Sequence, residues 1–286
     1  MKKCYVAMIT PFTREGSIDY EAVKRLIEHL IEKGCDGIVV CGTTGEAPTL
    51  SENERLDLLQ LVIERVSHRC EVIFGCGSNS TCDSLRLIKL SEAMDFDAYL
   101  IVTPYYNCPS QYGIYEHFAT LANETKKNIY LYNIPKRCGV GIQFKTLLQL
   151  VHDFKNIIGL KQADHDFDLV DAILKKYPDF IVLSGEDGYL LEGLQHGMQG
   201  TISVIAHLYA EEIKKLFDQF EKGDDCRSLD MYLKSITKLI FAQSNPSCIK
   251  YLLSKLKLCD NYLRLPLTPV EAKVQKQLDE AFYFDE

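Results

Sequence analysis

Eight short, nearly continuous apolar runs recur along the chain up to residue 206, and segments with helical periodicity separate them. The runs are 4–10, 36–42, 71–77, 97–103, 128–134, 156–161, 180–185 and 200–206. Because these runs do not alternate between apolar and polar residues, they indicate strands of a parallel sheet that is covered on both faces. Eight β/α units at intervals of roughly 20 to 35 residues predict an α/β fold, a (β/α)8 TIM barrel with a C-terminal helical extension.

The first two predicted helices have clear signals. A stripe of apolar residues at helical spacing ends before Gly34 and consists of Val23, Leu26, Ile27, Leu30 and Ile31. The next helix is predicted to begin after Ser51, because Glu54 follows at the spacing of a capping box.

An open, doubly wound sheet is the structural alternative to a barrel. It is disfavoured because no G-x-G-x-x-G motif opens the first β/α unit, and because eight units are the number that closes a barrel. After residue 207 the strand signal disappears, and helical stripes continue at 213–220, 231–240, 249–258 and 269–283. We therefore expect a catalytic barrel over 1–207 and a C-terminal helical region over 208–286 that packs on it.

Composition excludes several classes of protein. The 286 residues carry a formal charge of -8 with no basic stripe, so nucleic acid is not an expected partner. The sequence shows no signal peptide, and no apolar run approaches the length of roughly 20 residues that a membrane span needs. We therefore expect a cytoplasmic protein. The 11 cysteines lack C-x-x-C spacing and the 7 histidines form no ligand cluster, so neither disulfides nor a metal site is expected.

Polar residues follow several of the predicted strands at their carboxyl ends, where barrels of this kind carry their chemistry. The segment NIIGLK (156–161) ends in a lysine, GTTGE (42–46) follows the second strand, and TPYYN (103–107) follows the fourth. We expect one rim of the barrel to bring together Lys161, Thr43, Thr44, Tyr106, Tyr132 and, from the loop after the fifth strand, Arg137.

Lys161 ends a segment that reads as buried. A buried ammonium without a partner is costly, so the lysine lowers its pKa and loses the proton. A neutral amine in a dry pocket can attack a ketone and form a Schiff base, which then acts as an electron sink. The alternative is that Lys161 leans into solvent or pairs with Asp164.

The neighbouring residues suit a 2-oxo acid. Thr43 and Thr44 lie in a glycine-flanked turn that can present hydroxyl and N–H groups to a carboxylate, although such threonines can also satisfy their own backbone. Tyr106 and Tyr132 could shuttle protons through Thr43, or could be packing residues with a hydrated hydroxyl. Arg137 could hold a second carboxylate bidentately, or could be an exposed loop arginine.

Short segments that are typical of one enzyme family occur in order along the chain. They are ITPF (9–12), GTTGEAPTL (42–50), TPYYNCPSQYG (103–113), LYNIPKRCG (131–139), GLKQAD (159–164), SGED (184–187), GTISV (200–204), NP with Lys250 (245–250) and LRLPLTP (263–269). By these segments the chain resembles, over about residues 5 to 270, the dihydrodipicolinate synthase / N-acetylneuraminate lyase family of class I aldolases. Their order and spacing together make the resemblance specific.

The resemblance implies that Lys161 forms the Schiff base with pyruvate and that Tyr132 donates and accepts protons. Thr43 and Tyr106 would complete a proton relay, with Tyr106 reaching in from a neighbouring subunit. Thr44 would bind the pyruvate carboxylate.

The remaining implied binding residues are Ile202, whose backbone would close the pyruvate pocket, and Gly185. Two features favour the synthase branch of the family: Arg137, which follows Pro135 by two residues, and the LRLPLTP segment. In that branch the arginine binds the carboxylate of L-aspartate 4-semialdehyde. The implied reaction gives 4-hydroxy-tetrahydrodipicolinate in lysine and diaminopimelate biosynthesis. The implied assembly is a homotetramer of tight dimers, with neither a metal nor an organic cofactor.

Several positions depart from the family pattern, namely Cys108, Tyr112, Cys138 and Gln162. The positions that match the family's lysine-inhibition site carry Ala47, Pro48, Glu52, Arg55, Asn79, Asp83 and Tyr105, and from these we expect weak or absent inhibition by lysine. Two other functions stay open. One is a related pyruvate-dependent enzyme, a 2-keto-3-deoxy sugar acid aldolase or a sialic acid lyase, and the other is a barrel that binds a small acid without catalysis.

Overall fold

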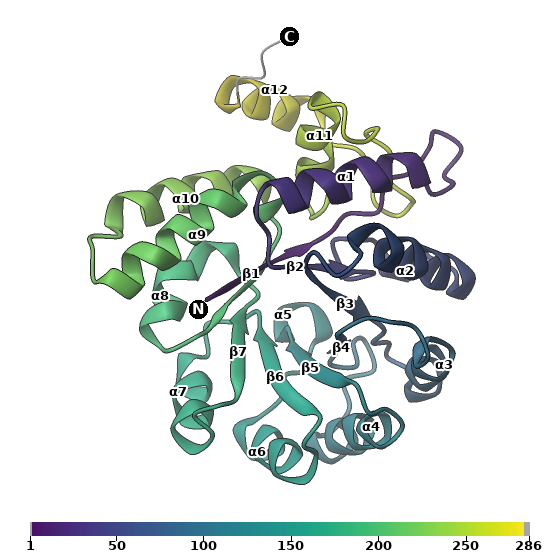
Figure 1. Ribbon diagram of the computed structural model, residues 1–286, viewed down its shortest axis with the longest axis vertical. Helices are drawn as coiled ribbons and strands as arrows, with labels where there is room; N and C mark the ends of the chain where they lie inside the picture. Colours follow the sequence, from purple (N-terminus) through teal and green to yellow (C-terminus); the bar gives the residue numbers. More distant parts are fainter. Residues whose placement is uncertain (1, 283–286) are drawn as a thin grey trace.

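The computed structural model describes residues 2–282 and contains a closed barrel of eight parallel strands, β1 to β8 in sequence order (Figure 1). The strands are β1 Lys3–Ala7, β2 Gly37–Val40, β3 Glu71–Gly75, β4 Ala98–Val102, β5 Asn128–Asn133, β6 Ile157–Gln162, β7 Ile181–Ser184 and β8 Gly200–Ser203. All eight lie within or beside the predicted runs. Closure between β1 and β8 excludes the open sheet and confirms the (β/α)8 barrel.

Helices surround the strands, as Figure 1 shows. They are α1 Tyr20–Glu32, α2 Glu52–Val66, α3 Thr81–Ser91, α4 Gln111–Asn123, α5 Pro135–Cys138, α6 Phe144–Asp153, α7 Phe167–Lys176 and α8 Leu190–Gln195, with short turns η1 Ala47–Thr49 and η2 Asp187–Tyr189. The capping box predicted for α2 is confirmed, because Ser51 accepts from the Glu54 backbone and the Glu54 carboxylate accepts from Ser51.

Four more helices follow the last strand: α9 Ala206–Lys222, α10 Arg227–Ile240, α11 Ser247–Lys255 and α12 Ala272–Ala281. The long helix α9 packs on β1 and β8, so it is the outer helix of the eighth β/α unit and spans residue 207. Helix α10 packs on α9 and on η2, and α11 and α12 pack on α10 and on each other. Residue 283, the end of the last predicted stripe, lies outside the described residues.

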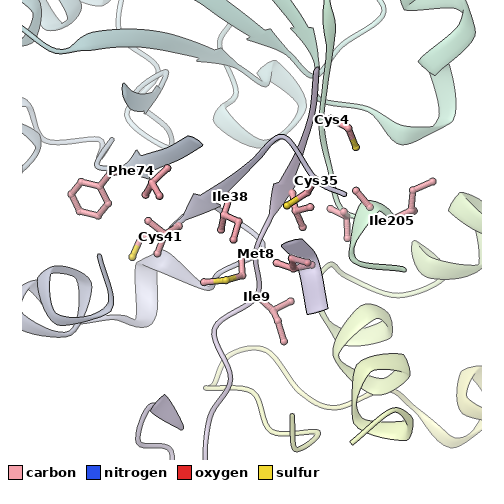
Figure 2. Close-up of a cluster of buried hydrophobic side chains, with 14 of the residues drawn as sticks. Cys4, Met8, Ile9, Cys35, Ile38, Cys41, Phe74 and Ile205 are labelled. Atoms are coloured by element: carbon pink, nitrogen blue, oxygen red, sulfur yellow. The ribbon is translucent and has the colours of Figure 1, made fainter. Parts of the chain in front are cut away.

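Side chains along each strand alternate between two hydrophobic layers. Val6 and Ile38 face the layer between strands and helices, part of which Figure 2 shows with Ile38, Met8 and Phe74 labelled. Tyr5 and Val39, one residue away on the same strands, face the barrel interior. Both faces are therefore buried, which explains why the sequence runs are apolar at nearly every position.

Tyrosines fill the end of the barrel that lies at the start of its strands. The Tyr5 hydroxyl donates to Glu71 at 2.9 Å, and Tyr5 also hydrogen-bonds Tyr130. Gly37 and Gly159 leave room for these rings, since a Cβ at either position would lie 2.6 Å from a ring carbon. The opposite end of the barrel is left for the functional side chains.

Within residues 2–282, no helix is long and apolar enough to span a bilayer.

Candidate active site

Lys161 lies near the end of β6 and points into the barrel. It pairs in register with Tyr132 on β5 and Leu183 on β7. Leu160, the preceding residue, belongs to the outer hydrophobic layer, so alternation places the Lys161 side chain inside. Its exposure is 7% and its Nζ lies 4.3 Å from the centre of the Tyr132 ring. None of the ion pairs among residues 2–282 joins Lys161 to Asp164, so the solvent-exposed and paired alternatives are both wrong.

Burial lowers the pKa of Lys161 to about 8, from a usual value of 10.5. The carboxylates of Asp187 and Glu186 oppose this shift, and the Arg137 guanidinium adds to it. Burial also raises the pKa values of Asp187 and Glu186. A substantial fraction of the amine is therefore neutral slightly above physiological pH, as a nucleophile for a carbonyl group requires.

Gly185, just after β7, makes space for the lysine. A Cβ at this position would lie 2.9 Å from Cε of Lys161 and 2.7 Å from the Cβ of Ala163. Any larger residue would displace the lysine side chain or the neighbouring strand. The glycine therefore acts on the site through the room that it leaves.

Tyr132 and Thr43 form a hydroxyl pair beside the lysine. Burial raises the pKa of Tyr132 to about 12, and a hydrogen bond with Thr43 opposes that shift. The phenol is therefore protonated at neutral pH and can act as a proton donor. The Thr43 hydroxyl offers a path for that proton away from the ring.

A cavity of about 260 Å³ joins these groups at the carboxyl ends of the strands. Its lining contains the expected residues Thr43, Thr44, Tyr132, Arg137, Lys161, Gly185 and Ile202. A second cavity of similar size adjoins it and shares Thr43, Tyr132 and Arg137. The predicted convergence on one rim is therefore observed for all the expected residues except Tyr106.

Arg137 lies in a short helix, α5, and not in the loop that we expected. Pro135 begins this turn of helix, whose last N–H groups bond back to Ile134 and Pro135. The helix places the guanidinium over both cavities. None of the ion pairs among residues 2–282 involves Arg137, so its guanidinium is available to an incoming carboxylate.

Tyr106 does not join the cavity of its own chain. Its side chain is 91% exposed, and its backbone, at a φ of 73°, is tied by a hydrogen bond from its N–H to the Cys138 carbonyl. Strand register could not reveal this, because Tyr106 follows β4 by four residues and the loop turns outward there.

Three residues near the lysine were not predicted as site residues. Glu186 and Asp187 follow β7 and act on Lys161 through their charge. Asn245, just before α11, lines the cavity and donates to Thr44. The SGED and NP segments were visible signals for these residues, but nothing in their spacing indicates which residues they contact.

The positions expected to weaken lysine inhibition lie around the second cavity and beside it. Ala47, Pro48 and Arg55 line that cavity, and Glu52 is paired with Arg86 on α3. Weak inhibition by lysine therefore stays a prediction.

Among residues 2–282, no group of three or more histidine, cysteine, aspartate or glutamate side chains is arranged to hold a metal ion.

A (β/α)8 barrel in which a desolvated lysine, two neighbouring hydroxyl groups and an arginine without an ion pair among residues 2–282 surround one cavity defines the class I aldolase type of site. The family model described as "Dihydrodipicolinate synthetase family" matches residues 1–283, and the chain belongs to this family.

Known relatives cover nearly the whole chain. A 4-hydroxy-tetrahydrodipicolinate synthase of Hydrogenobaculum sp. is 40% identical over 276 residues, which are 96% of this chain and 95% of that protein. The crystal structure of dihydrodipicolinate synthase from Aquifex aeolicus is 37% identical with a TM-score of 0.95, covering 98% and 97% of the two chains. A structure described as the first monomeric dihydrodipicolinate synthase variant is 34% identical with a TM-score of 0.94, covering 98% and 95%.

Proposed function

We propose that the protein condenses pyruvate with L-aspartate 4-semialdehyde to give 4-hydroxy-tetrahydrodipicolinate, a lyase reaction of lysine and diaminopimelate biosynthesis. The observation that carries this function is the buried amine of Lys161, 4.3 Å from the Tyr132 ring centre, in a cavity that an unpaired arginine overlooks. Membership of the family and the names of the relatives support the two substrates.

The reaction begins when the neutral amine of Lys161 adds to the ketone of pyruvate. Loss of water from the carbinolamine gives an imine, and loss of a proton from the adjacent methyl carbon gives a nucleophilic enamine. The enamine carbon bonds to the aldehyde carbon of aspartate semialdehyde, whose oxygen takes a proton. The amine of that substrate then displaces Lys161 from the imine carbon and closes the six-membered ring.

The other cavity residues serve binding and proton transfer in this scheme. Tyr132 gives and takes the protons of the carbinolamine and the aldehyde oxygen, with Thr43 as the relay. Thr44 holds the pyruvate carboxylate, and the backbone at Ile202 and Gly185 encloses the small ketone. Because the imine itself supplies the electron sink, the proposed reaction requires neither a metal nor an organic cofactor.

Borohydride reduction in the presence of pyruvate tests this function. The expected result is a stable pyruvate adduct on Lys161, located by peptide mass mapping. In a separate assay, enzyme that has not been treated with borohydride should consume aspartate semialdehyde. The rate of adduct formation should rise with pH through about 8, because protonated amine cannot attack the ketone. An unmodified Lys161 would favour the barrel that binds a small acid without catalysis.

Replacing Arg137 by leucine tests the acceptor. We expect the KM for aspartate semialdehyde to rise by about tenfold to a hundredfold, since a charge-assisted bidentate contact is lost. The pyruvate adduct on Lys161 should still form, although at a higher pH, because the guanidinium helps to lower the lysine pKa. Arg14→Leu removes an exposed arginine that lines neither cavity, so it is the matched control and should leave this KM unchanged. An unchanged KM would favour another aldehyde acceptor.

For Tyr106, we propose a role in the cavity of a neighbouring subunit of a homotetramer. Its 91% exposure supports this role, since a tyrosine so far out of its own cavity can reach another chain. The monomeric variant among the similar structures makes the assembly worth measuring by sedimentation. We place the protein in the cytoplasm, where its two substrates are proposed to meet.

A further inference from the structure

The turn at Gly42–Glu46, which carries both threonines of the site, is held by residues from the C-terminal part of the chain. Asn245 donates from Nδ2 to the Oγ1 of Thr44 at 2.9 Å, across 201 residues of sequence. A hydroxyl oxygen that accepts this bond keeps its own proton for another partner. The Asn245 Oδ1 has no partner among residues 2–282, so it does not take that proton. The Thr44 proton is therefore free for a ligand in the cavity.

Glu46 closes the same turn with a fully buried carboxylate. Its Oε1 lies 2.5 Å from Nζ of Lys250 on α11, and both side chains have 0% exposure. Its Oε2 accepts from the backbone N–H of Arg264 at 3.0 Å. The Glu46 backbone adopts the left-handed conformation, with a φ of 54°, which disfavours residues other than glycine. Such a conformation persists where surrounding contacts over-determine it, and these two contacts do so.

Lys250 is the second deeply buried lysine of the structure, but it is not a second nucleophile. Its Nζ also donates to the Tyr262 carbonyl at 2.9 Å and lies 4.2 Å from the centre of the Phe12 ring. Burial lowers its pKa, and the carboxylate of Glu46 opposes that shift. Unlike Lys161, it lines neither cavity beside the barrel mouth. Its ammonium group thus links the turn, through Glu46, to the segment that contains Tyr262.

Arg264 continues this set of contacts toward α2. Its guanidinium donates to the carbonyls of Gly16 and Thr49, each at 2.8 Å, and pairs with Glu54. Glu54 is the capping-box residue at the start of α2, which follows the turn. The segment from Asn245 to Arg264 therefore holds the turn at two of its residues, Thr44 and Glu46.

We propose that Asn245, Lys250 and Glu46 are positioning residues that orient the Thr44 hydroxyl and thereby set the affinity for the 2-oxo acid. The C-terminal helical region is, on this view, a part of the substrate site and not only a support for the barrel. The proposal rests on the proposed function, because the ligand of the hydroxyl is the pyruvate carboxylate.

Asn245→Ala is the first test. Half-saturation by pyruvate, measured from borohydride trapping on Lys161, should rise by about tenfold, while kcat at saturation stays within about twofold. Thr44→Val should raise the pyruvate concentration at half-saturation by a similar factor. In the Thr44→Val background, Asn245→Ala should raise that concentration little further, because the asparagine acts through the Thr44 hydroxyl. Full additivity of the two changes would overturn the proposal, as would an unchanged half-saturation in Asn245→Ala.

The buried pair provides a second test. Removing one charge alone leaves the other uncompensated, so the matched change is the double variant Glu46→Gln with Lys250→Met. We expect it to raise half-saturation by pyruvate by about tenfold without shifting the pH at which trapping begins. If it does not fold, the Asn245 and Thr44 cycle decides alone.

Lys255→Met is the control, because this lysine lies on the same helix and pairs at the surface with Asp279 at 3.2 Å. It should bind pyruvate as the native protein does. If the native protein itself gives no pyruvate adduct, the proposed function fails. If the native protein gives the adduct and Asn245→Ala traps pyruvate with the same half-saturation, the positioning proposal alone fails.

Discussion

Replacing Lys161 by methionine is expected to abolish the borohydride adduct, to lower turnover by at least about 10³-fold and to stabilise the fold. The loss of activity follows because no other amine of residues 2–282 lines the cavity except Lys136 on α5, which is exposed. The gain in stability follows because methionine fills similar space without a charge to desolvate. From a pKa of about 8 against 10.5, the expected gain near neutral pH is about 3 kcal/mol.

This gain depends on pH in a defined direction. Between pH 8 and 10.5 the unfolded chain holds a proton on Lys161 that the folded chain has lost, so the native protein becomes more stable as pH rises through this window. The advantage of the methionine variant should thus be full below pH 8 and should fade toward 10.5. Urea unfolding at three pH values measures it, with Lys255→Met as the exposed control. A variant less stable than the native protein at pH 7 would contradict the desolvated lysine.

Replacing Tyr132 by phenylalanine is expected to lower kcat by about 10² to 10³-fold with little change in stability. The ring that packs against Lys161 is kept, while the hydroxyl that hydrogen-bonds Thr43 is lost. Proton transfer to the carbinolamine and to the aldehyde oxygen then has no positioned donor. Stopped-flow trapping of the pyruvate imine and steady-state turnover together measure the loss.

Tyr130→Phe is the matched control for this change. Tyr130 is also an inward tyrosine of β5, two residues earlier, but it lies at the other end of the barrel and bonds Tyr5. Its replacement should leave kcat unchanged. Equal losses in the two variants, or a Tyr132 variant within twofold of the native kcat, would show that Tyr132 is a packing residue.

Much of the fold could be predicted because its signals are local. Apolar runs at every strand position follow from burial on both faces, and the capping box of α2 is a contact between residues three apart. These features depend on near neighbours, and near neighbours are what a sequence shows.

The candidate site could be predicted only in part. Each expected residue near a strand end reached the cavity, since closure of a parallel barrel brings all carboxyl ends of its strands together. Tyr106 did not, because the conformation of its loop and not the strand register directs its side chain outward.

The eightfold β/α repeat, the position of Lys161 at the end of a strand and the resemblance to the family could be read from the sequence alone, because periodicity and motif spacing are properties of the chain. The folded structure was needed to show which way Lys161 faces and how far it is desolvated, that Arg137 lines the cavity, and that Asn245 contacts Thr44. Those contacts join residues up to 201 positions apart, and they form only when the closed barrel and its C-terminal helices pack together. The apolar run before Lys161 indicated that this residue is buried, but the degree of its desolvation and the long-range hydrogen bonds are properties of that packing.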